Sequence, residues 1–163
     1  MGILHDYLER NGLSECEVSV LFLKLKIKSE QTEKSAAWTL FVELATRIAT
    51  QELPDDSGVE KRALDSLYEF FKKSRDILVQ HGRLAQNFSV IAVYAMNNVM
   101  RPFLAKWHRK NEVDKAFESV DECIKFRAEL KELQKELIAL AFCLGESAGL
   151  KPELTEKLLA KQS

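Results

Sequence analysis

Hydrophobic and polar residues follow one another along most of this chain with the spacing of α-helices. From residue 30 onward, apolar side chains recur every three or four positions, which places them on one face of a helix. Only six glycines and three prolines are present in the 163 residues, so few turns break the pattern. We therefore predict long helices over residues 30–53, 57–80, 87–110 and 113–147.

Residues that favour helix ends stand near these boundaries. Ser57 and Glu60 have the spacing of a capping box, in which two side chains bond backbone N–H groups at a helix start. The other expected boundary residues are Ser29 or Thr32 and Asn87 or Ser89 as N-caps, Gly82 and Gly149 as helix stops, and Pro152 in the first turn of a short tail helix.

The fourth predicted helix is the longest, with roughly 35 residues over about 50 Å. Its apolar seam, interrupted by Arg127, consists of Val113, Phe117, Val120, Ile124, Leu130, Leu133, Leu137, Leu140 and Leu144. Because the other helices are shorter, we expect one end of this helix to project or bend. Short loops between long helices favour antiparallel neighbours.

We therefore predict a mainly α fold: an up-and-down four-helix bundle with a long C-terminal helix and a short N-terminal β segment. The whole chain, 1–163, forms a single helical domain. Within it we distinguish an arm over 1–28, the bundle over 30–149 and the tail helix over 150–163.

The β segment is predicted from an alternation within residues 18–28. Leu23, Leu25 and Ile27 alternate with three lysines, which is the period of a strand with one wet face. A lone strand leaves backbone hydrogen-bonding groups without partners. Its partner is a copy of itself in a homo-oligomer, a hairpin within residues 13–28, or another protein.

Composition narrows the classes of function. The formal net charge is −1, without the basic excess of a dedicated nucleic-acid binder. Cys16, Cys123 and Cys143 show no metal-binding or disulfide spacing, so we expect no metal and no cofactor, and Cys123 and Cys143 as core residues. No apolar run is long enough for a membrane span. We therefore expect a cytoplasmic protein that does not bind membranes.

Polar side chains form stripes on two predicted helices. Glu43 and Arg47 are four residues apart and suit an ion pair, either on a narrow solvent face or at a partly buried seam. The third helix carries Tyr94, Asn97, Asn98, Arg101 and His108 within about a third of its circumference. Such a stripe needs a partner: another helix, a second subunit or a ligand. We expect Glu43 and Arg47 to form a polar network between helices with this stripe.

Pro102 lies inside this third helix, where it removes a backbone hydrogen bond. We expect a kink or break near residues 98–102, either as a structural irregularity or as room for a pocket that serves a small-molecule sensor. Trp38 and Trp107 are expected to anchor the core.

Arg101 and His108 are separated by six residues, and this pattern resembles the signature of HEPN ribonucleases, which are helical bundles. Arg75 and His81 give a second, less well placed match, since six positions turn them to different faces. The resemblance implies metal-independent RNA cleavage at a dimer interface. His108 would serve as general acid or base, and Arg101 would stabilise the charge on the phosphate.

Residues 38–51, 66–81 and 100–108 also resemble blocks of a bacterial family of helical proteins without an assigned activity. This resemblance implies a helical fold only.

The favoured function is a protein–protein interaction or regulatory module without catalytic activity of its own. It would associate through residues 18–28 with a copy of itself or with another protein. The alternative is a HEPN-like ribonuclease, and RNA is a partner only under that alternative.

Overall fold

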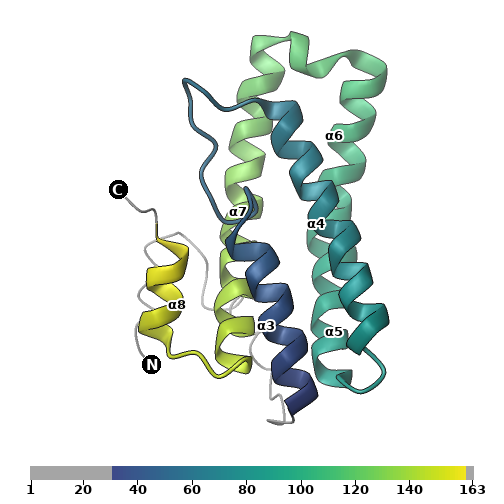
Figure 1. Cartoon of the computed structure of the whole chain (residues 1–163). Helices are drawn as coiled ribbons and strands as arrows, with labels where there is room; N and C mark the ends of the chain where they lie inside the picture. The colour runs from purple at the N-terminus through teal and green to yellow at the C-terminus, as the bar shows by residue number, and fades with distance from the viewer. Residues whose placement is uncertain (1–30, 161–163) are drawn as a thin grey trace.

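The computed structural model describes residues 31–160, which are predominantly helical (Figure 1). The elements are α3 (Gln31–Ala45), α4 (Glu60–His81), α5 (Gln86–Tyr94), the π-helix η1 (Ala95–Met100), α6 (Arg101–Asp114), the 3₁₀-helix η2 (Ala116–Glu118), α7 (Val120–Ser147) and α8 (Pro152–Leu159). The predicted mainly α class is confirmed. Within residues 31–160 there is no strand, and the predicted β segment with Leu23, Leu25 and Ile27 lies outside this range.

Consecutive long elements run in opposite directions (Figure 1). The segments α5, η1 and α6 follow one another as a single rod, which we call the α5–α6 rod. Helix α3 packs against α7 and α4, α4 packs against α6, and α8 lies on the last turns of α7.

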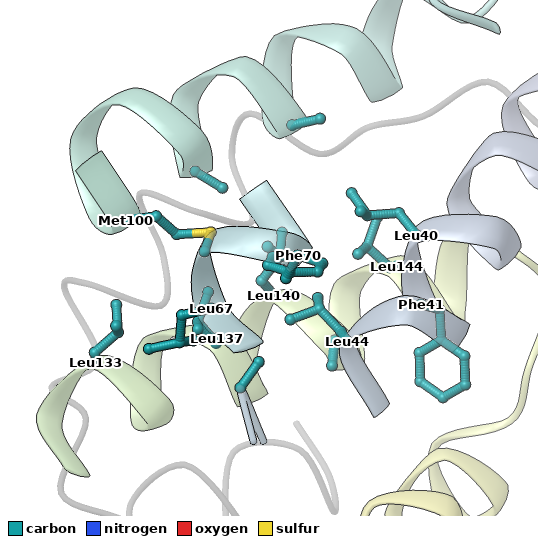
Figure 2. Close-up of a cluster of buried hydrophobic side chains, with 14 of the residues drawn as sticks. Leu40, Phe41, Leu44, Leu67, Phe70, Met100, Leu133, Leu137, Leu140 and Leu144 are labelled. Carbon is teal, nitrogen blue, oxygen red and sulfur yellow. The ribbon is translucent and has the colours of Figure 1, made fainter. Parts of the chain in front are cut away.

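The core is formed where α3, α4, η1 and α7 meet (Figure 2). Helix α3 contributes Leu40 and Leu44, and α4 contributes Leu67 and Phe70, all of them buried. Four leucines of α7 face them: Leu133, Leu137, Leu140 and Leu144. Most of the predicted α7 seam is thus the core, because burial of these aliphatic side chains is the main stabilising term.

The prediction for the two tryptophans was right for only one of them. Trp107 is completely buried, whereas Trp38 is 46% exposed and lies on Phe41, with 5.7 Å between ring centroids. The two cysteines of the described residues also differ, since Cys143 is buried and Cys123 half-buried.

The first helix ends earlier than predicted, at Ala45 instead of Leu53. Two threonine hydroxyls donate to main-chain carbonyls there: Thr46 Oγ1 to Val42 O at 2.7 Å and Thr50 Oγ1 to Leu44 O at 3.0 Å. Side-chain bonds of this kind compete with helical ones. Residues 46–59 consequently form a long loop before α4.

The predicted capping box at the start of α4 was wrong. The Ser57 hydroxyl donates to Asp56 Oδ1, and Val59 is the N-cap, without a side-chain cap. Glu60 instead accepts a hydrogen bond from Arg127 Nε at 2.6 Å. A distant arginine therefore holds the carboxylate that the sequence pattern assigned to the cap.

The start of α5 is capped from another helix. Buried Glu33 of α3 accepts the backbone N–H groups of Asn87 at 3.0 Å and Phe88 at 2.9 Å. The two residues predicted as N-caps do not cap the helix. Asn87 lies inside it, and the Ser89 hydroxyl donates to the carbonyls of Gly82 and Ala85. A carboxylate at a helix N-terminus is favoured by the helix dipole.

The predicted fourth helix begins at Val120 instead of Val113, and α6 continues to Asp114. Lys115 adopts a left-handed φ of 53°, and η2 then leads to Ser119, whose hydroxyl accepts from Glu122 N. The first part of the predicted seam is consequently at the surface, with Val113, Val120 and Ile124 exposed. Gly149, with φ of 91°, ends this region close to the predicted place.

Arg127, the residue that interrupts the seam, binds the loop 46–59. Its guanidinium donates to the carbonyls of Leu53, Pro54 and Gly58 and to the carboxylates of Asp55 and Glu60. Two turns further along the same side, Gln134 Nε2 donates to Ile48 O at 2.7 Å and Gln51 O at 2.6 Å. Two side chains of α7 thus donate hydrogen bonds to five main-chain carbonyls of the loop.

Arg127→Ala should lower the free energy of unfolding by about 3 kcal/mol, because it leaves a half-buried carboxylate and several carbonyls without their donor. Arg127→Lys should recover only part of the loss, since an ammonium group cannot reach all the acceptors of a planar guanidinium. Urea denaturation measures both. The exposed Lys131→Ala is the control, and equal stability of the Arg127 and Lys131 variants would show that the loop does not depend on Arg127.

Candidate functional site

The α5–α6 rod changes its helical type at the place where the sequence predicts a kink. Residues Ala95–Met100 are π-helical, and the N–H of Arg101 donates to Met96 O, five residues earlier. Pro102 follows in the first turn of α6 and has no N–H to donate. A wide turn just before a proline accommodates the missing donor, and such π segments are frequent at functional sites.

The predicted polar stripe runs along this segment. Arg101 Nε and Nη2 donate to Asn97 Oδ1 at 3.2 and 2.9 Å, and Asn98 Nδ2 donates to the carbonyl of Tyr94 at 3.2 Å. Asn97, Asn98 and Arg101 are exposed. The stripe therefore presents amide and guanidinium groups to the surface.

Arg101 and His108 both face α4. The guanidinium of Arg101 lies over the ring of Phe71, with its carbon 5.4 Å from the ring centroid. The ring of His108 meets that of Tyr68 edge-on, with 5.3 Å between centroids and 78° between planes. Lys72 Nζ also lies over the ring of Tyr68, 5.1 Å from its centroid. Cationic and aromatic groups thus alternate along the edge between α4 and α6.

His108 has one unusual feature. Within residues 31–160, its Nε2 is a buried atom without a hydrogen-bond partner. A buried ring nitrogen without a hydrogen-bond partner costs free energy. This nitrogen is enclosed between the helices rather than presented to the surface.

Glu43 of α3 and Arg47, just beyond the end of this helix, form the predicted pair. Arg47 Nε and Nη2 donate to Glu43 Oε2 at 2.9 and 2.8 Å, and both side chains are about a quarter exposed. The hydrogen bonds present in residues 31–160 do not connect this pair with Asn97 or Arg101. Arg75 and His81, the second match to the HEPN pattern, lie on α4, exposed and half-buried respectively.

The sequence analysis did not single out the uncharged surface of α5. Residues 84–100 contain no Asp, Glu, Lys, Arg or His, although charged residues make up 30% of the chain. On this stretch Val90 is 60% and Val93 44% exposed. We call Val90, Val93, Asn97 and Asn98 the neutral face. Its signal in the sequence is the absence of charge over four helical turns.

A shallow groove lies between α6 and α7, with a volume of about 310 Å³. Its apolar part is formed by Val99, Pro102, Phe103 and Leu133, and its rim by Lys106, Glu129, Glu132 and Glu136. The sequence left undecided whether Pro102 makes room for a pocket. In the structure, Pro102 lines this groove. Glu129 also accepts hydrogen bonds from Lys106 Nζ and from Trp107 Nε1, the latter at 2.9 Å.

The described thiols are poor nucleophiles. Burial raises the pKa of the Cys143 thiol far above its usual range, and desolvation also raises the pKa of Cys123, together with the nearby Glu60 carboxylate. Among residues 31–160 no three His, Cys, Asp or Glu side chains are grouped as a metal site requires. In the same range, every helix is too short or too polar to cross a membrane.

No protein-family model, curated protein or solved structure matches the chain.

One ion-pair cluster joins α6 to α7 beyond the groove. Glu122 contacts Lys110 of α6 and accepts a hydrogen bond from Lys125 Nζ at 2.8 Å. Hydrogen bonds from Lys110 and then Lys125 lower the pKa of Glu122 to about 2. Lys110 also stands over the ring of Trp107, 5.2 Å from its centroid.

Glu122→Gln should therefore destabilise the protein in a pH-dependent way. A lowered pKa in the folded state stabilises the fold above the unfolded pKa of about 4.3, and the effect is lost as the pH falls toward 2. The variant should melt below the native protein at pH 5–7, and the difference should shrink between pH 4 and 2. Glu118→Gln, an exposed carboxyl on the adjacent turn, is the control. A difference that is independent of pH would contradict the ion pair.

Proposed function

We propose that this protein is a protein–protein interaction or regulatory module without catalytic activity of its own. In this proposal α3, α4, the α5–α6 rod and α7 are the four helices of an up-and-down bundle in the cytoplasm. The bundle presents a binding surface, and residues 18–28 add a strand that associates with a second copy or another protein.

The observation that carries the proposal is the neutral face. Surface helices of a highly charged chain normally expose charged side chains, and apolar surface without charge is typical of the centre of an interface. Val90 and Val93 provide apolar area, while the amides of Asn97 and Asn98 each have both donors and acceptors. Tyr94 and Arg101 beside them belong to the residue types that are enriched at interfaces.

A second copy of the chain suits this surface. Two neutral faces approach each other without bringing like charges together, and amide side chains can bond their own kind. Burial of apolar area then favours association without the cost of removing charges from water. We therefore expect the protein to form a homo-oligomer.

Light scattering on the purified protein tests this expectation. The native chain should have at least twice the mass of a monomer, and Val90→Glu with Val93→Glu should convert it to a monomer that keeps its helical circular dichroism. The control is Val113→Glu with Val120→Glu, two valines near the junction of α6 and α7 that are even more exposed than Val90 and Val93. A native monomer, or equal effects of both pairs, would refute the role of the neutral face.

A HEPN-like ribonuclease remains the second candidate, supported by one observation. Arg101 and His108 lie on the same edge of α6, with Phe71, Tyr68 and Lys72 beside them. Aromatic rings interleaved with cations suit the stacking of bases and the binding of phosphates. The buried Nε2 of His108 argues against this candidate, because a general acid or base must reach the reacting group.

RNA cleavage in the presence of EDTA distinguishes the two functions. The first proposal predicts that the native protein and the Arg101→Ala, His108→Ala variant leave a labelled single-stranded RNA equally intact. Cleavage by the native protein that falls at least a hundredfold in the variant would establish the ribonuclease and overturn the first proposal. Arg75→Ala with His81→Ala is the matched control.

A further inference from the structure

Acidic residues are absent from one long part of this chain. The sequence contains 25 aspartates and glutamates, yet none lies between Asp76 and Glu112. This stretch covers the last turn of α4 and nearly the whole α5–α6 rod. Because the surfaces of soluble proteins normally mix both signs of charge, a surface without carboxylates is a distinctive feature of this highly charged chain.

The cations of this acid-free stretch fall into two groups. Lys106 and Lys110 of α6 form ion pairs with Glu129 and Glu122 of α7. Within residues 31–160, three exposed cations of the stretch have no carboxylate partner: Arg83, Arg101 and Arg109. The cations that face α7 are thus neutralised within the protein, whereas the exposed arginines are not.

Two unpaired arginines come together where α4 packs against the rod. Tyr68 of α4 contacts His108. Phe71, one turn later on α4, contacts Arg101, which lies earlier on the rod, because the two elements run in opposite directions (Figure 1). Arg75 follows Phe71 by one further turn on the same side of α4. It is exposed and, among residues 31–160, has no carboxylate partner either. We call Tyr68, Phe71, Arg75 and Arg101 the arginine edge.

The guanidinium of Arg101 is held in position without being neutralised. It donates to Asn97 Oδ1, which is an uncharged acceptor, and lies over the ring of Phe71. Since a guanidinium has five N–H donors in one plane, donors remain for a carboxylate. The ammonium group of Lys72 nearby is already paired with Glu69. The positive charge of the arginine edge therefore comes from its two arginines.

Apolar surface lies at both ends of the arginine edge. Val79 follows Arg75 by one turn on α4 and is 87% exposed, and Tyr68 at the other end is 44% exposed. A ligand that covers the whole edge therefore needs carboxylates in its middle and apolar groups on either side. A protein segment offers both, whereas nucleic acid offers phosphates, which bind broader basic surfaces than this chain of net charge −1 provides.

We propose that the arginine edge binds an acidic, partly apolar segment of another protein. Its carboxylates pair with Arg75 and Arg101, and its apolar side chains cover Val79 and the ring of Tyr68. A second copy packed through its neutral face brings residues of the same acid-free stretch, so the carboxylates come from another protein. The proposal rests on the proposed function as an interaction module and names the chemistry of a partner.

A dodecapeptide library displayed on phage tests this contact with the full-length protein as bait. We expect the native protein to enrich peptides that combine Asp or Glu with large apolar residues. The most enriched peptide, labelled with fluorescein, should bind Arg75→Gln with Arg101→Gln about tenfold more weakly by fluorescence anisotropy. The matched control is Arg62→Gln with Lys131→Gln, which removes two exposed cations elsewhere and should bind like the native protein. Circular dichroism checks that both variants are folded.

Three outcomes overturn the proposal: no enriched peptides, enriched peptides without acidic residues, or equal binding by the Arg75→Gln, Arg101→Gln variant and the control. A labelled single-stranded RNA is measured in parallel. RNA that binds more tightly than the peptide, and only with both arginines present, would assign the edge to nucleic acid instead. If the proposal fails while light scattering still shows a dimer that Val90→Glu with Val93→Glu dissociates, the proposed function stands. A native monomer without enriched peptides overturns both.

Discussion

The hydrogen bonds of Arg127 and Gln134 hold together a fold that would otherwise contain a long unsupported loop. Residues 46–59 join α3 to α4 without a helix, and their inward carbonyls need donors. Both donors come from α7, whose leucines form one side of the core. Helix α7 thus binds the loop through hydrogen bonds and packs against α3 and α4 through its leucines. These contacts together fix the position of α4 relative to α3. A polar break in an apolar seam is thus a structural requirement of this fold.

Helical periodicity was enough to predict which parts of residues 31–160 are helical, but not where several helices end. The misplaced ends have a common cause: the groups that satisfy them are distant in sequence. Glu33 caps α5 from another helix, and Arg127 takes the carboxylate of Glu60. Local patterns such as the capping box describe only neighbours along the chain. Spacing alone also could not show that Val113, Val120 and Ile124 flank a sharp turn at Lys115, where the seam leaves the core.

The candidate sites likewise divide into features that the sequence could predict and features that depend on how the helices pack. The contacts of Glu43 with Arg47, and of Asn97 with Arg101, follow from a separation of four residues and could be predicted. The position of His108 against Tyr68 depends on how α4 packs on α6, and the groove depends on α6 and α7, so neither is visible in one helix. The neutral face is different, since its evidence was present in the sequence as a stretch without charge.

Charge is distributed unevenly along the α5–α6 rod, and this distribution bears on function. Its α6 end is tied to α7 by Lys106–Glu129 and Lys110–Glu122, whereas α5 and η1 carry no charged side chain. Ion pairs at one end hold the scaffold, and neutral residues at the other end can be covered without desolvating a charge. Catalysis by Arg101 and His108 would require the opposite arrangement, with titratable groups open to a substrate. The buried Nε2 of His108 and the exposed valines of α5 therefore both favour association over chemistry at this surface.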